Sequence, residues 1–282
     1  MIAVAMNTTR RGFFGGAAAL ASSIGPSAGQ AGPDASFHLG VASYSLRGFN
    51  RAVAIGYLTK RLRERYVNIK DFHLAMGPRE DVERGRKEFE KAGLVILGGG
   101  TISFPTSDDA DIRKRFDYAK TAGMPLIVAA PQRDVLPKLE KYVREYDIKL
   151  AVHNHGPEDK QFPTPQSILE LIATMDPRVG LCIDVGHTAR TGKDVVGSIR
   201  EAGPRLLDMH IKDLGNFTDR ESQVPVGDGI VPIPGIFREL MRMNYRGGVM
   251  LEYEIDEDDP IPGMLRSFAY MRGVLAGMRA PA

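Results

Sequence analysis

Residues 179–187 read Val-Gly-Leu-Cys-Ile-Asp-Val-Gly-His, a short stretch that combines a strand pattern with reactive side chains. The apolar residues Val179, Leu181, Ile183 and Val185 recur with the two-residue period of a β-strand. Cys182 and Asp184 would therefore face the opposite side of that strand. A carboxylate is costly to bury unless it is paired or bound to a cation. The stretch therefore predicts a buried strand that carries a charged group into an enclosed polar site.

Three further stretches repeat this alternation, over residues 148–155, 207–212 and 249–254. In each, one set of side chains is apolar and is expected to pack outward under helices. This set comprises Ile148, Leu150, Val152, Leu207, Met209, Ile211, Val249, Leu251 and Tyr253. The opposite set is expected to point inward and comprises Ala151, His153, His155, Asp208, His210, Lys212, Met250, Glu252 and Glu254.

Strand-like and helix-like segments alternate along the whole chain after residue 34. Between the apolar runs lie charged segments with helical periodicity, such as 79–91, 109–120, 135–146 and 193–201. Eight such units in about 250 residues predict an α/β fold of the closed (β/α)8 TIM-barrel type, as a single domain over 35–282. An open doubly wound sheet is less favoured, because no Gly-x-Gly-x-x-Gly sequence follows the first run. The apolar runs begin near Phe37, Tyr66, Leu94, Met124, Ile148, Val179, Leu206 and Gly248.

The N-terminal 34 residues have the composition of a targeting segment. Thr9-Arg10-Arg11-Gly12-Phe13-Phe14 precedes a short stretch of small and apolar residues, which resembles a twin-arginine export signal. We therefore expect residues 1–34 to be a signal peptide or a disordered segment, and the protein to be exported to the periplasm. A short interfacial helix is the alternative.

Charge and composition exclude several classes of partner. The net charge is +2, and removing Arg10 and Arg11 leaves a neutral body without a long-range field for nucleic acid. No apolar run reaches the roughly 18 residues that a membrane span requires. Cys182 is the single cysteine, so the chain cannot form an internal disulfide. The expected partner is a small-molecule sugar, and a homo-oligomer is possible.

Five of the six histidines fall at or just beyond the end of a predicted strand, where barrel active sites form. Two imidazoles and two carboxylates converging from four strands suit one divalent metal ion, and Mn, Zn, Fe, Co and Ni all accept such a mixed set. The predicted ligands are His153, Asp184, His210 and Glu252. A metal-free hydrogen-bond network of the same residues is the alternative.

Four motifs resemble the xylose-isomerase-like barrel superfamily of sugar isomerases, epimerases and their relatives, over about residues 37–276. They are Asp184-Val185-Gly186-His187, His210-Ile211-Lys212-Asp213, Gly227-Asp228-Gly229 and Leu251-Glu252. The resemblance implies that Asp184, His210 and Glu252 bind metal and that His187 contacts the substrate. One departure is His153, because epimerases of this group usually carry a Glu there. Dehydratase and lyase relatives place a basic histidine two residues further on, where this chain has His155.

Other polar residues are candidates for substrate contact. Lys70 and His73 follow the second predicted strand, and Glu158 lies in a predicted lid. Lys212 would point inward beside His210, either as an electrophile or as a partner of Asp208 or Glu254.

These residues predict an enzyme that forms a metal-stabilised enediolate from a non-phosphorylated keto-sugar or sugar derivative. His155 is the expected general base, with Glu252 and Lys212 as further catalytic residues. Sugar isomerisation or epimerisation is the leading interpretation, and β-elimination from a 3-keto-glycoside or keto-polyol by a lyase or dehydratase is the alternative.

Three other interpretations remain. A non-catalytic sugar-binding barrel would bind its ligand without changing it. A metal-free enzyme would remain active in chelator. A multi-zinc abasic-site endonuclease shares the barrel, but this chain lacks that enzyme's extra third-strand histidine.

Overall fold

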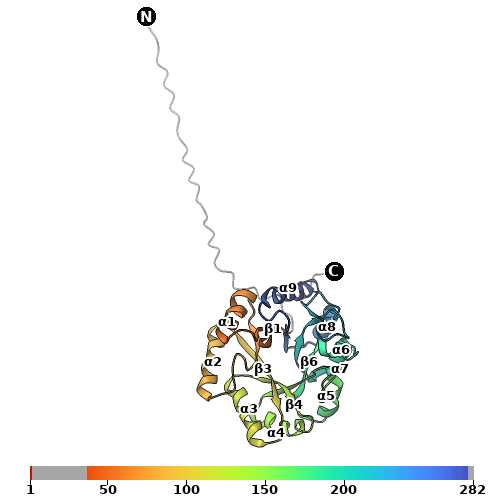
Figure 1. Cartoon of the computed structure of the whole chain (residues 1–282). Coiled ribbons are helices and arrows are strands. Elements are labelled where there is room, and N and C mark those ends of the chain that lie inside the picture. The colour runs from red at the N-terminus through yellow and green to blue at the C-terminus, as the bar shows by residue number, and fades with distance from the viewer. Residues whose placement is uncertain (2–36, 279–282) are drawn as a thin grey trace. The chain divides into compact units, whose positions relative to one another are not determined.

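The computed structural model describes Met1 and residues 37–278 and shows a closed barrel of eight parallel strands. The eight strands are hydrogen-bonded around the ring in the order β1-β10-β7-β6-β5-β4-β3-β2. Each expected apolar run contains one of these strands, so the predicted fold class is confirmed (Figure 1). The strands are β1 (His38–Ala42), β2 (Tyr66–Ile69), β3 (Val95–Phe104), β4 (Leu126–Pro131), β5 (Lys149–His153), β6 (Val179–Asp184), β7 (Leu206–Ile211) and β10 (Gly248–Leu251).

Helices follow the strands and surround the barrel (Figure 1). Their inward sides pack on outward-facing strand residues in one large apolar cluster, which includes Val41, Ile127, Leu181 and Phe268. The α-helices are α1 (Arg51–Gly56), α2 (Arg79–Lys91), α3 (Asp109–Thr121), α4 (Leu136–Tyr146), α5 (Pro165–Ile172), α6 (Val185–Arg190), α7 (Val195–Ala202), α8 (Ile233–Arg242) and α9 (Ile261–Gly277). Shorter helical turns are η1 (Ser43–Leu46), η2 (Tyr57–Leu62) and η3 (Gly203–Arg205).

A second, smaller cluster fills the inside of the barrel. Leu126, Val128, Ala151 and Cys182 form it, and Leu207 packs against it. The outward position predicted for Leu207 is therefore wrong. The pairing between β6 and β7 shifts by one residue, because Leu181 faces Leu206 whereas Cys182 faces Asp208. This bulge adds a residue to β7, and simple alternation cannot foresee it.

The strand predicted over 179–185 ends one residue early, because Val185 begins α6. Asp184 caps this helix, since its Oδ1 accepts a hydrogen bond of 2.8 Å from the backbone N–H of His187. The same residue therefore ends a strand and starts a helix, which fixes its side chain at the mouth of the barrel. None of the helices within 37–278 has the length and apolarity that a membrane crossing requires. The expected export signal lies outside the described residues.

The long connection after β7 is held by one buried carboxylate. Asp213 accepts hydrogen bonds from the N–H groups of Gly227 and Val231, both at 2.9 Å, and of Gly229 at 3.1 Å. Asp213 belongs to a two-stranded antiparallel sheet formed by β8 (Asp213–Leu214) and β9 (Gln223–Val224). The Gly227-Asp228-Gly229 turn is thus fixed to the end of β7 by charge-assisted hydrogen bonds.

We expect Asp213→Ala to lower the free energy of unfolding by about 2–3 kcal/mol, because buried N–H donors lose an ionised acceptor. Urea denaturation followed by circular dichroism measures this change. Asp258→Asn is the control, since Asp258 is exposed on another loop. Equal stability of the wild type and Asp213→Ala would show that the carboxylate does not hold the connection.

Candidate metal centre

Four buried side chains from four neighbouring strands meet at the carboxyl-terminal mouth of the barrel. His153 ends β5, Asp184 ends β6, His210 lies in β7 and Glu252 directly follows β10. One potential ligand atom from each lies within 4.8 Å of the others. Because parallel strands in register bring their ends to one rim, the alternation predicted from sequence is sufficient to assemble this group.

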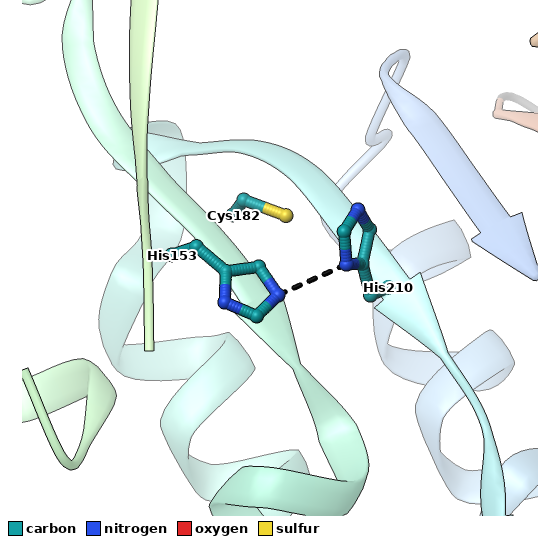
Figure 2. Close-up of side chains that lie close together, drawn as sticks. All are labelled: His153, Cys182 and His210. Carbon is teal, nitrogen blue, oxygen red and sulfur yellow. Dashed lines mark hydrogen bonds between the residues drawn. The ribbon is translucent and has the colours of Figure 1, made fainter. Parts of the chain in front are cut away.

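The ligand atoms of the group face one another closely. His153 Nε2 lies 2.9 Å from His210 Nδ1 (Figure 2), and His210 Nδ1 lies 3.2 Å from Glu252 Oε2. Asp184 Oδ2 is 3.7 Å from His153 Nε2, and its close charged neighbour is the Lys212 ammonium at 3.1 Å, although no described group meets hydrogen-bond geometry with it. Two imidazoles and two carboxylates, one of them with a buried oxygen that accepts no well-oriented hydrogen bond from the described residues, fit the donor set of a divalent transition metal.

The protonation preferences of the group depend on its burial. Burial holds the pKa of His153 well below its usual range, and the nearby His155 and His210 add to the effect. Burial also acts to lower the pKa of His210, but the Glu252 carboxylate outweighs it and raises that pKa to about 9. Without a metal, one proton is therefore preferentially held between His210 and Glu252, and a bound cation would take its place.

Cys182 lies one layer deeper, and Figure 2 shows its sulfur beside the two imidazoles. Its Sγ donates to Asp208 Oδ2 at 3.7 Å, and Asn68 Nδ2 donates to the same oxygen at 2.5 Å. Burial raises the pKa of Cys182 well above its usual value, which keeps the thiol protonated while no metal is bound. Burial likewise raises the pKa of Asp208 to about 7. Asn68, Cys182 and Asp208 thus form a hydrogen-bonded layer beneath the predicted metal ligands.

Lys212 directly follows β7 and extends its side chain into the centre, with only 3% of that side chain exposed. Its Nζ lies 3.1 Å from Asp184 Oδ2 and 2.9 Å from Glu252 Oε2, and it donates to Glu254. Of the two partners expected from sequence, Glu254 is confirmed, whereas Asp208 bonds to Asn68 and Cys182. Lys212 therefore balances the carboxylates around the predicted ligands.

A cavity of about 570 Å³ opens above the centre, within the size range of small-molecule sites. His155, His187 and Glu158 line it together with Lys212 and Glu254. The His155 ring lies 4.4 Å from that of His153 and 6.0 Å from that of His187. Burial lowers the pKa of His187 to about 4, so this imidazole stays neutral near neutral pH.

The structure places Lys70 and His73 away from this cavity lining. Lys70 Nζ donates to the carbonyl of Thr101 at 2.6 Å. His73 is buried, with its ring nitrogens 3.0 Å from Ser43 Oγ and 3.1 Å from the Leu46 carbonyl. Lys70 therefore binds strand β3 and His73 binds the helical turn η1, and His73 has no ring nitrogen left for a substrate in this arrangement.

Arg190 is a cavity residue that the sequence reasoning missed. Only 6% of its side chain is exposed, and its guanidinium donates to Glu158. The available signal was the spacing of three residues from His187, which puts both on one side of a helix. That signal has meaning only once α6 is known to begin at Val185. Gln223 was also missed, and it binds the Glu252 carbonyl and the Glu254 N–H.

We expect Gly186→Ala to destabilise the protein by about 1–3 kcal/mol, the usual cost of overpacking. A Cβ atom at Gly186 would lie 2.8 Å from both Cγ and Cδ of Lys212. Chemical denaturation measures the effect, with Gly273→Ala as the control, because no atom lies within 4 Å of a Cβ there. Equal stability of both variants and the wild type would contradict close packing of Gly186 on Lys212.

Comparison with known proteins agrees with this architecture. An inosose dehydratase of Lactiplantibacillus plantarum is 25% identical over 221 residues, which cover 68% of this chain and 70% of that protein. An inosose dehydratase of Mesomycoplasma hyopneumoniae (strain 7448) is 27% identical over 50% of this chain, and the match spans about half of that relative, 53%. The crystal structure of the IolI protein with a bound zinc atom superposes with a TM-score of 0.69 at 17% identity, over 87% of this chain and all of that one, which is a likeness of fold.

The family model described as "Xylose isomerase-like TIM barrel" matches residues 54–274, which contain all four predicted metal ligands. The match extends over most of the described barrel, from α1 to α9. This chain therefore belongs to the xylose isomerase-like TIM barrel family.

Proposed function

We propose that this chain is a divalent-metal-dependent enzyme that removes the proton beside the carbonyl group of a non-phosphorylated keto-sugar or keto-polyol. The observation that carries the proposal is the convergence of His153, Asp184, His210 and Glu252 beneath a cavity whose wall holds His155. When bound by these four residues, a divalent ion would supply Lewis acidity toward the substrate carbonyl. The bound zinc in the IolI protein, which shares the fold, supports such an ion here.

His155 is the proposed general base. Asp159 Oδ2 lies 3.4 Å from its Nδ1, which favours a proton on that nitrogen and leaves Nε2 as the proton acceptor. The ring is partly exposed in the cavity, so a substrate can reach it. The neutral imidazole of His187 and the Glu158–Arg190 pair are proposed to orient the sugar hydroxyls.

The arrangement favours elimination over two-base epimerisation. An epimerase needs a second group that returns the proton to the opposite face, and Glu252 and Glu254 are the carboxylates nearest to that task. Both are paired with Lys212, which leaves His155 as the freer base. After His155 takes the proton, the C–H electrons form the enediolate. The hydroxyl on the next carbon then takes this proton from His155 and leaves as water, while the enediolate electrons form the new C=C double bond. The names of the inosose dehydratase relatives agree with this outcome.

The non-phosphorylated substrate follows from the proposed export of the protein and from the pairing of cations in the cavity. Lys212 and Arg190 are held by carboxylates, and Arg47 lies 2.9 Å from Glu257, whereas Arg220 at the cavity wall is exposed and lies 3.9 Å from Glu221. A phosphate group bound by Lys212, Arg190 or Arg47 would have to displace the carboxylate that each of them holds. We therefore propose a periplasmic sugar or keto-polyol as the substrate, handled by a protein carrying the twin-arginine signal of residues 1–34.

We expect the metal-loaded protein to exchange the α-proton of an inosose, a free ketose or a 3-keto-glucoside with deuterated water, measured by proton NMR. Loss of water, seen by mass spectrometry, identifies elimination, and an isomer of unchanged mass identifies isomerisation or epimerisation. His155→Ala should slow exchange by about 100-fold or more, the scale of a lost general base. The variant should keep its metal.

His38→Ala is the matched control, because His38 begins β1 and stacks on Tyr66, away from the cavity lining. Its exchange rate should equal that of the wild type. Exchange by His155→Ala at the wild-type rate would exclude His155 as the base. Tight ligand binding by the wild type without any exchange would instead support a sugar-binding barrel.

A further inference from the structure

The Lys212 ammonium contacts two carboxylate oxygens that a cation bound by the predicted ligands would also contact. Its Nζ approaches Asp184 Oδ2 to 3.1 Å and Glu252 Oε2 to 2.9 Å. These same two oxygens face the imidazoles, at 3.7 Å from His153 Nε2 and 3.2 Å from His210 Nδ1. The ammonium and a metal ion therefore share ligand atoms and do not merely lie in one neighbourhood.

The position of Lys212 is built into the fold. Its side chain is 3% exposed, and its stem lies against Gly186, where any side chain would collide with it. Glu254 gives the ammonium a third carboxylate, which is not among the four predicted ligands. Lys212 can thus release Asp184 and Glu252 and still keep one charged partner at the cavity wall.

The charges around Lys212 suit such an exchange. Asp184, Glu252 and Glu254 contribute three negative charges and Lys212 one positive charge. Once metal entry has displaced the proton held between His210 and Glu252, the sum is −2, which one divalent ion would cancel. Buried carboxylates without a cation would destabilise the barrel. The ammonium therefore lets the centre stay assembled while no metal is present.

We infer that Lys212 is the resident cation of the metal-free centre, that it competes with the divalent ion for Asp184 and Glu252, and that metal entry leaves its ammonium on Glu254. This inference rests on the proposed metal centre. Lys212 is then a positioning residue that lowers the affinity of the centre for the divalent ion. It also couples metal loading to the presentation of a positive charge at the substrate cavity.

Removing the ammonium tests the inference through metal affinity. Lys212→Met keeps the length of the stem and should bind Mn²⁺ at least about ten-fold more tightly than the wild type, since a close competing charge is lost. Competition with a chromophoric chelator gives the dissociation constants. Lys193→Met is the control, because it removes the same charge from an exposed position and should leave affinity unchanged.

A double variant separates competition from net charge. Lys212→Met combined with Glu254→Gln restores the sum of −2 without an ammonium on the ligand oxygens, and it should still bind Mn²⁺ more tightly than the wild type. It also guards against misfolding of the single variant, and near-ultraviolet circular dichroism checks the fold of both. A return to wild-type affinity in the double variant would mean that Lys212 acts only through net charge, which would overturn the inference.

The remaining outcomes separate this inference from the proposed function. Metal uptake by the wild type with unchanged affinity in Lys212→Met would overturn the role of Lys212 and leave the metal centre intact. No uptake by any variant would overturn both.

Discussion

The burial of two carboxylates, Asp184 and Glu252, at one end of a closed barrel is the constraint to which the surrounding structure responds. Asp184 is fully buried, and Glu252 is 9% exposed. Each needs a cation or several donors to offset the loss of hydration. Lys212 meets both of them and Glu254, while His210 shares a proton with Glu252. Gly186 has to remain small so that the lysine stem can reach them.

Because of this constraint, strand ends carry the predicted metal ligands and loops carry residues of the cavity. Strand pairing fixes the backbone of the predicted ligands, because His210 pairs with both Asp184 and Met250, and His153 pairs with Cys182. Loops supply the cavity residues His155 and Glu158, whose positions can adapt to a ligand. Asp213 links the strand ends to a loop, because it fixes the connection that follows β7. Gln223 in this connection donates to the Glu252 carbonyl and accepts from the Glu254 N–H. A change far from the cavity can therefore disturb the ligand geometry.

Much of the barrel and the ligand group could be predicted from the sequence, because both depend on local periodicity. A two-residue alternation decides which side of a strand Asp184 or His210 occupies, and parallel strands bring their ends together. The bulge at Leu207 and the helix start at Val185 depend on pairing and capping, which the alternation does not record. His73 lies at a strand end as expected, yet its ring is used by Ser43 and Leu46, partners 30 and 27 residues away.

The metal content of the full-length protein, purified without chelator and measured by elemental analysis beside His210→Ala, tests the central claim most directly. The account predicts about one divalent transition-metal ion per wild-type chain, as for a four-ligand site, and almost none in a folded His210→Ala protein. A wild-type protein that takes up no metal even on titration would contradict it, because the inward carboxylates would then be balanced by Lys212 and His210 alone. Two or three zinc ions per chain would instead fit the multi-zinc endonuclease interpretation.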